Sequence, residues 1–379
     1  MKILIAPDFY PVRRVEDKLK QQEFEYLMGD IRPIVEDADY SLVNYESTFH
    51  GDGDAVTKFG PSMATDENSV KLAQWCGFKG VTLGNNHIHD YGDKGLLDLL
   101  DCLQRNKIDF VGAGMNLEES GKTLYKNIDN KIVAFINCCE HEFNVADKEH
   151  GGANPLDVVR QYYAITEAKM KADYVIVIVH GGSIDCQLPS PRMQKTYRFF
   201  IDCGASAVVN HHQHCFSGYE YYHDAPIFYG LGNLLFDKPW LKNTTWTDGY
   251  MLELSNGSKD NGKLWDFKIY PYLQCADEPR IIMKKGKDRN LFDKKLKELN
   301  SIIKNPELLE REFYKWVDSK EDMCKEAMSI TTNKYIKALQ RRHLLPRVTS
   351  DTLNLLNYIY CEAHLDRMLR YLKKKYIVQ

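Results

Sequence analysis

Hydrophobic and polar positions over the first 275 residues form two alternating patterns. Short apolar runs rich in β-branched residues predict buried strands. Segments between the runs have apolar residues at helical spacing. Strands that alternate with helices in this way predict a layered α/β domain. The apolar runs lie at residues 2–6, 40–43, 80–83, 132–138, 174–179, 205–209 and 226–231, with a shorter one around Val111.

Three of the intervening segments predict helices. After Asp93, leucines at 96, 99, 100 and 103 fall on one face of a helix. A second helix is predicted over residues 155–171. A third begins at Ser190, a side-chain cap followed by proline, and ends at Gly204.

Two later segments, residues 249–254 and 264–272, alternate more regularly between apolar and polar positions. This alternation predicts antiparallel strands with one buried face. The dipeptide Asn256-Gly257 between them is typical of a tight turn.

Strand signals cease near Pro279, and the pattern beyond it is helical. Lys, Glu, Leu and Asn dominate, with apolar spacing such as Leu353, Leu356, Tyr360 and Ala363. We therefore predict an α/β domain over residues 1–280 and a helical extension over residues 281–379.

Composition is that of an ordinary soluble protein, with 44% hydrophobic and 27% charged residues. No apolar run approaches the roughly 20 residues of a membrane span, so we expect no transmembrane segment. The N-terminus lacks the long apolar region of a signal peptide. The ten cysteines show no Cys-x-x-Cys pair, and Cys102, Cys138 and Cys203 lie in apolar runs typical of buried thiols. These features predict a cytoplasmic protein.

Charge is distributed unevenly. Residues 281–379 hold 22 Lys and Arg against 13 Asp and Glu, whereas residues 1–280 hold 28 against 40. A basic extension can contact an anionic membrane, an acidic polymer or a partner subunit. Amphipathic helices with a solvated, mildly basic face are the plainer interpretation, since acids are interspersed among the bases. The acidic main part, without an aromatic and basic motif, argues against nucleic-acid binding.

Residues able to bind a cation follow five of the predicted strands. Four of these groups have an ordinary alternative: a helix cap or turn for Asp8, a loop acid for Glu46, a buried histidine for His180, and a surface cluster for the later histidines. Together they predict a pocket at one sheet edge, where α/β enzymes place their chemistry. The groups are Asp8, Glu46, Asn85-Asn86-His87, His180 and Asn210-His211-His212-Gln213-His214.

Carboxylate, amide and imidazole ligands without thiolate suit Mn²⁺, Fe or Zn²⁺ in a catalytic site. Two overlapping sets can hold two ions about 4 Å apart, bridged by one carboxylate. Such ions generate hydroxide at neutral pH. His87 can donate a proton, and Asp90 is close enough in sequence to orient its ring.

The order of these motifs resembles the poly-γ-glutamate capsule biosynthesis (CapA-type) family of the calcineurin-like metallophosphoesterase superfamily. The resemblance covers residues 1 to about 240 and fades beyond them. It rests on Asp8 and on residues 44–46 (NYE), 85–92 (NNHIHDYG), 112–119 (GAGMNLEE), 180–182 (HGG), 211–214 (HHQH) and 226–237 (PIFYGLGNLLFD).

The resemblance implies a four-layered α/β/β/α sandwich. It also implies one metal position formed by Asp8, Glu46 and His214, and a second formed by Glu46, Asn86, His180 and His212. Glu46 would bridge the two, and His87 would be the general acid, supported by Asp90. We expect Asn44, His89 and Asn233 to bind substrate, Asn233 because it lies at the end of another strand.

Several positions depart from the family pattern. Pro7 stands where a glycine is usual, Gly181 where a tryptophan is usual, and Asn210 where a glycine precedes the histidines. His89 replaces a more usual aliphatic residue. Tyr10 occupies the place of a superfamily histidine, which leaves one metal position short of a ligand.

Two functions follow as hypotheses. The first is a metal-dependent hydrolase of capsule or cell-surface polymer metabolism, with metal-bound hydroxide attacking a phosphoester or a γ-glutamyl amide. Its substrate would be an anionic polymer or a phosphorylated small molecule. The second is a non-catalytic accessory or substrate-binding subunit that works with capsule-synthesis partner proteins.

Overall fold

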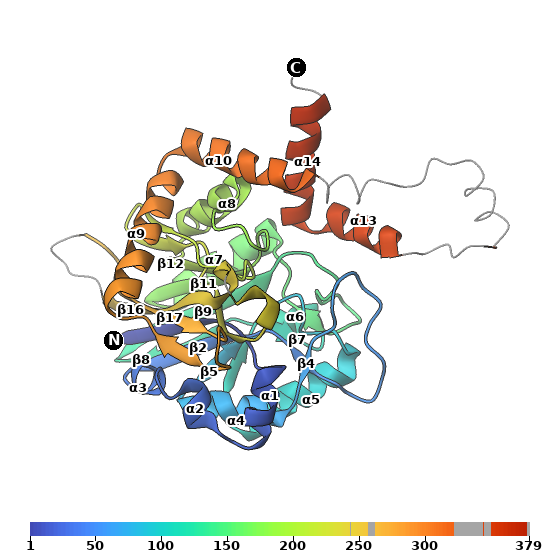
Figure 1. Cartoon of the computed structure of the whole chain (residues 1–379), viewed down its shortest axis with the longest axis vertical. Coiled ribbons are helices and arrows are strands. Elements are labelled where there is room, and N and C mark those ends of the chain that lie inside the picture. The colour runs from blue at the N-terminus through green and yellow to red at the C-terminus, as the bar shows by residue number, and fades with distance from the viewer. Residues whose placement is uncertain (243, 257–261, 322–343, 345–349, 377–379) are drawn as a thin grey trace.

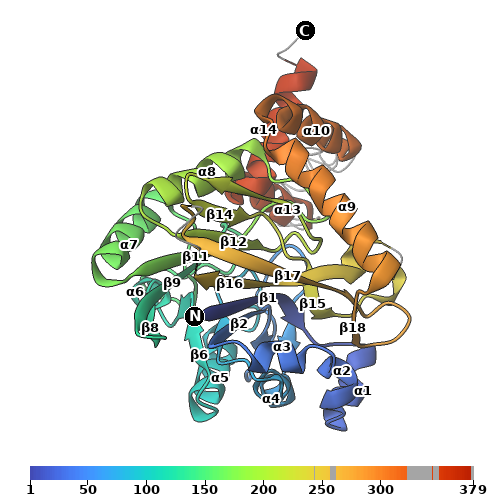
Figure 2. The ribbon, with the colours of Figure 1, turned by 90° about the vertical axis from the view of Figure 1, so that its left-hand side faces the viewer.

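Two β-sheets pack face to face, and helices cover both of their outer faces (Figure 2). The computed structural model describes residues 1–242, 244–256, 262–321, 344 and 350–376. These layers confirm the predicted α/β/β/α sandwich, and the chain ends in further helices (Figure 1). No helix in these described ranges has the length and apolar character needed to cross a membrane.

The first sheet has eight strands in the order β18-β17-β16-β1-β2-β5-β6, with β15 also paired to β1. Strands β1, β2, β5, β6 and β15 are parallel, whereas β16, β17 and β18 are antiparallel. Their bounds are β1 (Lys2–Tyr10), β2 (Tyr40–Tyr45), β5 (Gly80–Thr82), β6 (Asp109–Val111), β15 (Asn233–Phe236), β16 (Asp248–Asn256), β17 (Trp265–Gln274) and β18 (Ile281–Met283).

The second sheet has six strands in the order β13-β14-β12-β11-β9-β8. The four central strands are parallel, and the two edge strands are antiparallel. Two short ladders, β3 (Thr48–Phe49) with β4 (Ala64–Thr65) and β7 (Ala113–Gly114) with β10 (Gly152–Ala153), lie outside both sheets. The six strands are β8 (Leu124–Ile128), β9 (Lys131–Cys139), β11 (Tyr174–His180), β12 (Ala207–His211), β13 (Tyr219–Tyr222) and β14 (Ala225–Phe228).

Successive side chains of each central strand enter different layers, because they point to opposite faces of the sheet. In β1, Ile3 and Ile5 lie in the core between the sheets, and Leu4 packs against the outer helices. In β11, Ile176 faces the inter-sheet core, while Val177 faces the helices on the other side. Continuous apolar runs in the sequence therefore reflect burial on both faces.

Helices flank the two sheets on opposite sides (Figure 2). The predicted leucine stripe is buried on α5, and the two later predicted helices are observed as α7 and α8. Helices α1 to α4 were not predicted from the sequence. The helices are α1 (Arg14–Lys20), α2 (Phe24–Met28), α3 (Arg32–Glu36), α4 (Glu67–Cys76), α5 (Gly92–Arg105), α6 (Leu117–Ser120), α7 (Val158–Lys171) and α8 (Pro191–Asp202), with short 3-10 turns η1 (Pro239–Leu241) and η2 (Thr245–Thr247).

Strands β16 and β17 pair antiparallel, as predicted. The predicted turn at Asn256-Gly257 extends outside the described residues. Strand β18 lies at the start of the segment predicted to be helical, so the first sheet continues past the predicted end of the strands near Pro279. All nine cysteines among the described residues are free; Cys102 and Cys138 are buried as predicted, whereas Cys203 is partly exposed.

The C-terminal part consists of helices, and its first helix is part of the main core. Phe292, Leu296 and Leu299 of α9 pack into the apolar core between the sheets. Of the residues whose spacing predicted a helix, Leu356 and Tyr360 are exposed and Ala363 is buried; Tyr358 and Cys361 are buried as well. The helices are α9 (Gly286–Ile303), α10 (Pro306–Ser319), α13 (Ser350–Tyr360) and α14 (Glu362–Tyr376).

Candidate metal centre

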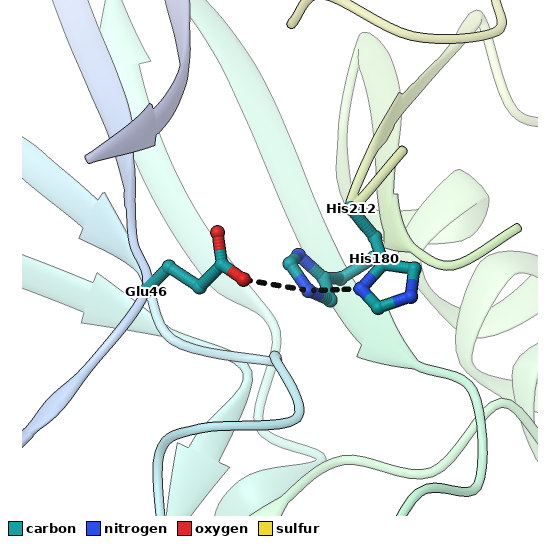
Figure 3. Close-up of side chains that lie close together, drawn as sticks. All are labelled: Glu46, His180 and His212. Carbon is teal, nitrogen blue, oxygen red and sulfur yellow. Dashed lines mark hydrogen bonds and ion pairs between the residues drawn. The ribbon is translucent and has the colours of Figure 1, made fainter. Parts of the chain in front are cut away.

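The carboxyl ends of strands from both sheets meet at one place. Asp8 lies near the end of β1 and Glu46 directly follows β2, both in the first sheet. His180 ends β11 in the second sheet, and His212 follows β12. Figure 3 shows Glu46 reaching toward His180 and His212 from the opposite sheet. The site is therefore built across the interface of the two sheets.

Glu46 is the residue whose surroundings most clearly indicate a cation. It is fully buried, and neither carboxylate oxygen has a hydrogen-bond partner. Its Oε1 lies 3.5 Å from His214 Nε2 and 3.8 Å from His180 Nε2. Burial, and then the charge of Asp8, raise the pKa of Glu46 well above its ordinary value. A buried unpaired carboxylate is costly, and a bound cation between these groups would compensate it.

The donor atoms form two groups that share Glu46. The first contains Glu46, His180 and His212, and the second contains Asp8, Glu46 and His214. Within each group all donor atoms lie within 4.8 Å of one another. Oxygen and imidazole donors of this kind suit a borderline divalent cation. The residues present thus fit the two metal positions that the family resemblance implies.

Asp8 is held in place by three neighbours. Asn44 Nδ2 donates a hydrogen bond of 2.8 Å to Oδ1, and the backbone N–H of His212 lies 3.2 Å from Oδ2. Oδ2 also lies 3.2 Å from His214 Nδ1. Burial alone would raise the pKa of Asp8, but His214 and Asn44 hold it below its ordinary value. Asp8 is therefore an anion at neutral pH, the form that could bind a metal ion.

His180 lies between the amide and imidazole members of the cluster. Its Nε2 is 3.0 Å from Asn86 Oδ1 and 3.0 Å from His212 Nδ1. Burial, followed by the neighbouring histidines, lowers the pKa of His180 well below its ordinary value. The ring is consequently neutral, which is the form that binds a metal. Asn86 and His180 thus converge on one point, as predicted.

The loop after β12 has unusual backbone geometry. His212 has φ of 84° and His214 has φ of 54°. Non-glycine residues seldom adopt positive φ, and such strain concentrates at functional sites. Gly182, after β11, also has φ of 105°. His211, which the family resemblance leaves without a role, is buried with both ring nitrogens unpartnered, and its Nδ1 lies 3.8 Å from Asp8 Oδ1.

His87 lies beside the metal-ligand cluster and borders the cavity above it. Its Nδ1 is 2.7 Å from Asp90 Oδ2 and 3.1 Å from Lys58 Nζ. Burial and the charge of Lys58 lower the pKa of His87 to about 4, so the free site holds a neutral ring. Lys58 also pairs with Asp90. This arrangement orients the imidazole and places Asp90 where it can stabilise a protonated ring.

The three expected substrate-binding residues have different surroundings. Asn44 is fully buried behind the ligands, where it bonds Asp8 and lies 3.3 Å from His180 Nδ1. Asn233 is also fully buried, and its Oδ1 lies 2.9 Å from His214 Nδ1. His89 pairs with Asp93 at 2.9 Å and does not border the cavity. Asn44 and Asn233 therefore contact the candidate ligands and do not border the cavity.

A cavity of about 510 Å³ opens above the cluster. Its floor includes Asn86, His87 and His214. Residues of the C-terminal helices form another part of the lining, called here the C-terminal wall, and the whole lining contains more cations than acids. The charged residues of the lining are Lys58, Lys238, Lys320, Arg367, Glu142 and Asp185.

Glu142 is a member of the site that the sequence analysis missed. It accepts a hydrogen bond of 2.5 Å from Asn86 Nδ2, and its Oε1 lies 4.0 Å from His212 Nε2. Burial would raise the pKa of Glu142, but His212, His364 and Asn86 lower it to about 2. It follows β9, one of the predicted strands, so the strand-end signal that located the other ligands also applies here.

A third group of donors lies on the C-terminal side of the cavity. Glu142, Cys361 and His364 have donor atoms within 4.8 Å of one another. His364 Nε2 is 3.5 Å from Glu142 Oε1. The C-terminal helices therefore contact a residue that directly supports the metal-ligand cluster.

The chain is similar to several capsule biosynthesis proteins. Residues 2–238 match the family model described as bacterial capsule synthesis protein PGA_cap. A capsule biosynthesis protein CapA of Bacillus anthracis is 26% identical over 82% of this chain and 80% of its own length. A PGA biosynthesis protein CapA of Bacillus subtilis is 30% identical over 61% of this chain and 62% of its own length.

A probable polyglutamine synthesis accessory protein of Mycobacterium tuberculosis is 24% identical over 57% of this chain and 60% of its own length. The chain thus spans about 60% of the length of two of these relatives. The family match includes every residue of the two donor groups that share Glu46. The chain belongs to the bacterial capsule synthesis protein PGA_cap family.

Proposed function

We propose that this protein is a metal-dependent hydrolase that acts on an anionic polymer or a phosphorylated compound in capsule or cell-surface polymer metabolism. The single observation that supports it most is Glu46, a buried carboxylate with no hydrogen-bond partner, flanked by His180 and His214. Family membership supports the capsule context. The scissile bond would be a phosphoester or a γ-glutamyl amide.

The residues that would hold the metal form two sets. Asp8, Glu46 and His214 would provide one, and Glu46, His180 and His212, with the Asn86 amide oxygen, would provide the other. Divalent ions bound there supply water activation and offset negative charge at the attacked centre. Mn²⁺, Fe or Zn²⁺ match this donor chemistry.

His87 would act as the proton donor to the leaving group. Its Nδ1 faces Asp90, which leaves Nε2 as the ring nitrogen for proton transfer. An anionic substrate in the cavity would raise the low pKa of His87, because negative charge nearby stabilises the imidazolium. Proton uptake would then accompany substrate binding.

Metal analysis combined with hydrolysis assays tests the proposal. The protein should contain stoichiometric transition metal, and His212→Ala and His214→Ala should each reduce it. His223→Ala, at an exposed histidine far from the cluster, is the matched control. Metal-loaded protein should cleave p-nitrophenyl phosphate or oligo-γ-glutamate, and removing the metal should abolish cleavage. Loaded protein that cleaves neither class would refute the hydrolase.

A non-catalytic accessory role is the second candidate. The Mycobacterium relative is described as an accessory protein, and Tyr10 here lies edge-on to Phe236 at 5.0 Å and offers no imidazole ligand. In that case the cluster would bind metal and polymer without turnover. Oligo-γ-glutamate that binds tightly and is recovered intact would favour this role.

A further inference from the structure

We propose that Arg367 and Lys320, from the C-terminal helices, form an anion-binding subsite that recognises an acidic group of the substrate away from the scissile bond. This inference rests on the proposed function for the identity of the substrate. It concerns residues beyond the part of the chain that matches the family model, which ends at residue 238.

Arg367 is the main observation. Its side chain is 96% buried, since only 4% of the residue is exposed, yet it borders the cavity above the metal centre. Its Nε has no hydrogen-bond partner, and no acid among the described residues pairs with its guanidinium. Its contacts are aromatic: the Cζ lies 5.1 Å from the Tyr358 ring centroid and 5.7 Å from that of Trp316. A buried guanidinium without a counter-ion is costly unless a ligand supplies the charge.

Lys320 adds a second positive charge to the same wall. It lies at the C-terminus of α10, and its Nζ is 5.5 Å from the Trp316 ring centroid. Both cations therefore stack on one aromatic residue and border one cavity. A planar guanidinium presents a fork of donors that matches carboxylate and phosphate oxygens.

Polar contacts attach helix α14, which carries Arg367, to the residues that follow β9. The backbone N–H of His141 donates to Glu362 at 2.8 Å, and the His141 ring also contacts Glu362. His364 reaches Glu142, which in turn bonds Asn86 of the metal centre. Phe313, Val317 and Tyr358 join Cys186 of the main part in a separate apolar cluster. The subsite consequently has a set position relative to the metal ligands.

A substrate with several acidic groups fits this arrangement. The candidate ligands Asn86 and His214 border the same cavity as Arg367 and Lys320. An oligo-γ-glutamate would place a carboxylate at the C-terminal wall while its amide lies near the metal centre. A phosphorylated compound with a second phosphate group would present the same kind of anionic oxygens to Arg367 and Lys320.

Calorimetric binding to the full-length chain tests the subsite. The probes are tri-γ-glutamate and inorganic phosphate, each with metal-free and with Mn²⁺-loaded protein. In metal-free protein, R367Q should weaken binding about 10- to 100-fold, as expected for lost charge-assisted hydrogen bonds. R367K should lose less, and K320Q should also weaken binding. K374Q, the same charge change on an exposed side chain of α14, should bind as wild type.

A loss for tri-γ-glutamate alone identifies a carboxylate subsite, and an equal loss for phosphate identifies a phosphate subsite; both support the proposal. Because K320Q changes a partly exposed residue, it tests the subsite even if R367Q fails to fold. Wild-type affinity in the folded R367Q and K320Q variants would overturn it. Turnover that requires metal in wild type, with unchanged binding in R367Q, would refute the subsite while the hydrolase stands. Lost binding in R367Q, with no turnover in metal-loaded wild-type protein, would support the subsite and refute the hydrolase.

Discussion

Glu46 and His180 face each other across the boundary between two sheets: Oε1 of Glu46 lies 3.8 Å from Nε2 of His180. One residue follows β2 in the first sheet, and the other ends β11 in the second. Their separation is therefore set by how the two sheets pack through Ile5, Leu42 and Ile178. Any change that shifts one sheet against the other should alter the metal centre.

Glu46→Gln should change stability in opposite directions with and without metal. In metal-free protein the substitution removes a buried, unpaired carboxylate and should stabilise the fold by roughly 1–3 kcal/mol at neutral pH. In metal-loaded protein it removes a shared ligand and should destabilise the fold. Urea unfolding with EDTA and with Mn²⁺ measures both effects. Glu149→Gln, at an exposed position, should change neither, and destabilisation in both conditions would argue against a metal ligand.

His87→Gln should separate proton transfer from metal binding. The ring lies outside both donor groups, so metal content should stay at the wild-type level. Turnover should fall about 10²- to 10⁴-fold, the usual contribution of a general acid. Elemental analysis and steady-state kinetics measure the two properties. His89→Gln is the control, since His89 does not border the cavity and should leave turnover nearly unchanged.

The contact between His141 and Glu362 should make attachment of the C-terminal helices depend on pH. Glu362 raises the pKa of His141 above its ordinary value of 6.5, and Asp157 and Glu140 act in the same direction. The stabilisation is therefore complete below pH 6.5 and is lost as pH rises through the raised value. Because both side chains are partly exposed, the effect should not exceed about 1 kcal/mol.

Urea unfolding of wild type and His141→Asn between pH 5 and 9 measures this contribution. The difference between the two proteins should be largest at low pH and should shrink at high pH. A difference that is constant across this range would mean that the ion pair contributes nothing.

Truncation at the predicted domain boundary should prevent stable folding. A chain of residues 1–280 lacks α9, whose Phe292, Leu296, Leu299 and Ile303 are buried. Burial of four such side chains contributes roughly 6–12 kcal/mol, comparable to the whole stability of about 5–15 kcal/mol of a typical protein. A chain of residues 1–305 keeps α9 and should fold cooperatively. Circular dichroism during urea unfolding compares the two, and a stable 1–280 fragment would instead support the predicted boundary.

The strand-end pattern predicted much of the site from sequence. Asp8, Glu46, Asn86, His180, His212 and His214 converge because parallel strands present their carboxyl ends together. The pattern could not show that Asn44 and Asn233 bond ligands, since this depends on side-chain direction. It also missed α1 to α3, which have only five to seven residues and weak periodicity.

The contribution of the C-terminal helices to the cavity could not be predicted from the sequence, for a different reason. Arg367 lies 281 positions after Asn86 in the chain, and only tertiary packing brings both to one cavity. The sequence shows the net positive charge of the extension. Because acids are interspersed among the bases, however, it favours a solvated helix surface over a binding site. Several of its described cations do form such surface ion pairs, as Lys374 does with Asp318.

The division of the cavity between two stretches of chain has an evolutionary consequence. Substitutions in the late helices can alter which molecules are admitted without disturbing the early residues on which reactivity depends. Relatives that share the early part and diverge in the late one would then be expected to differ in selectivity while retaining a common reaction.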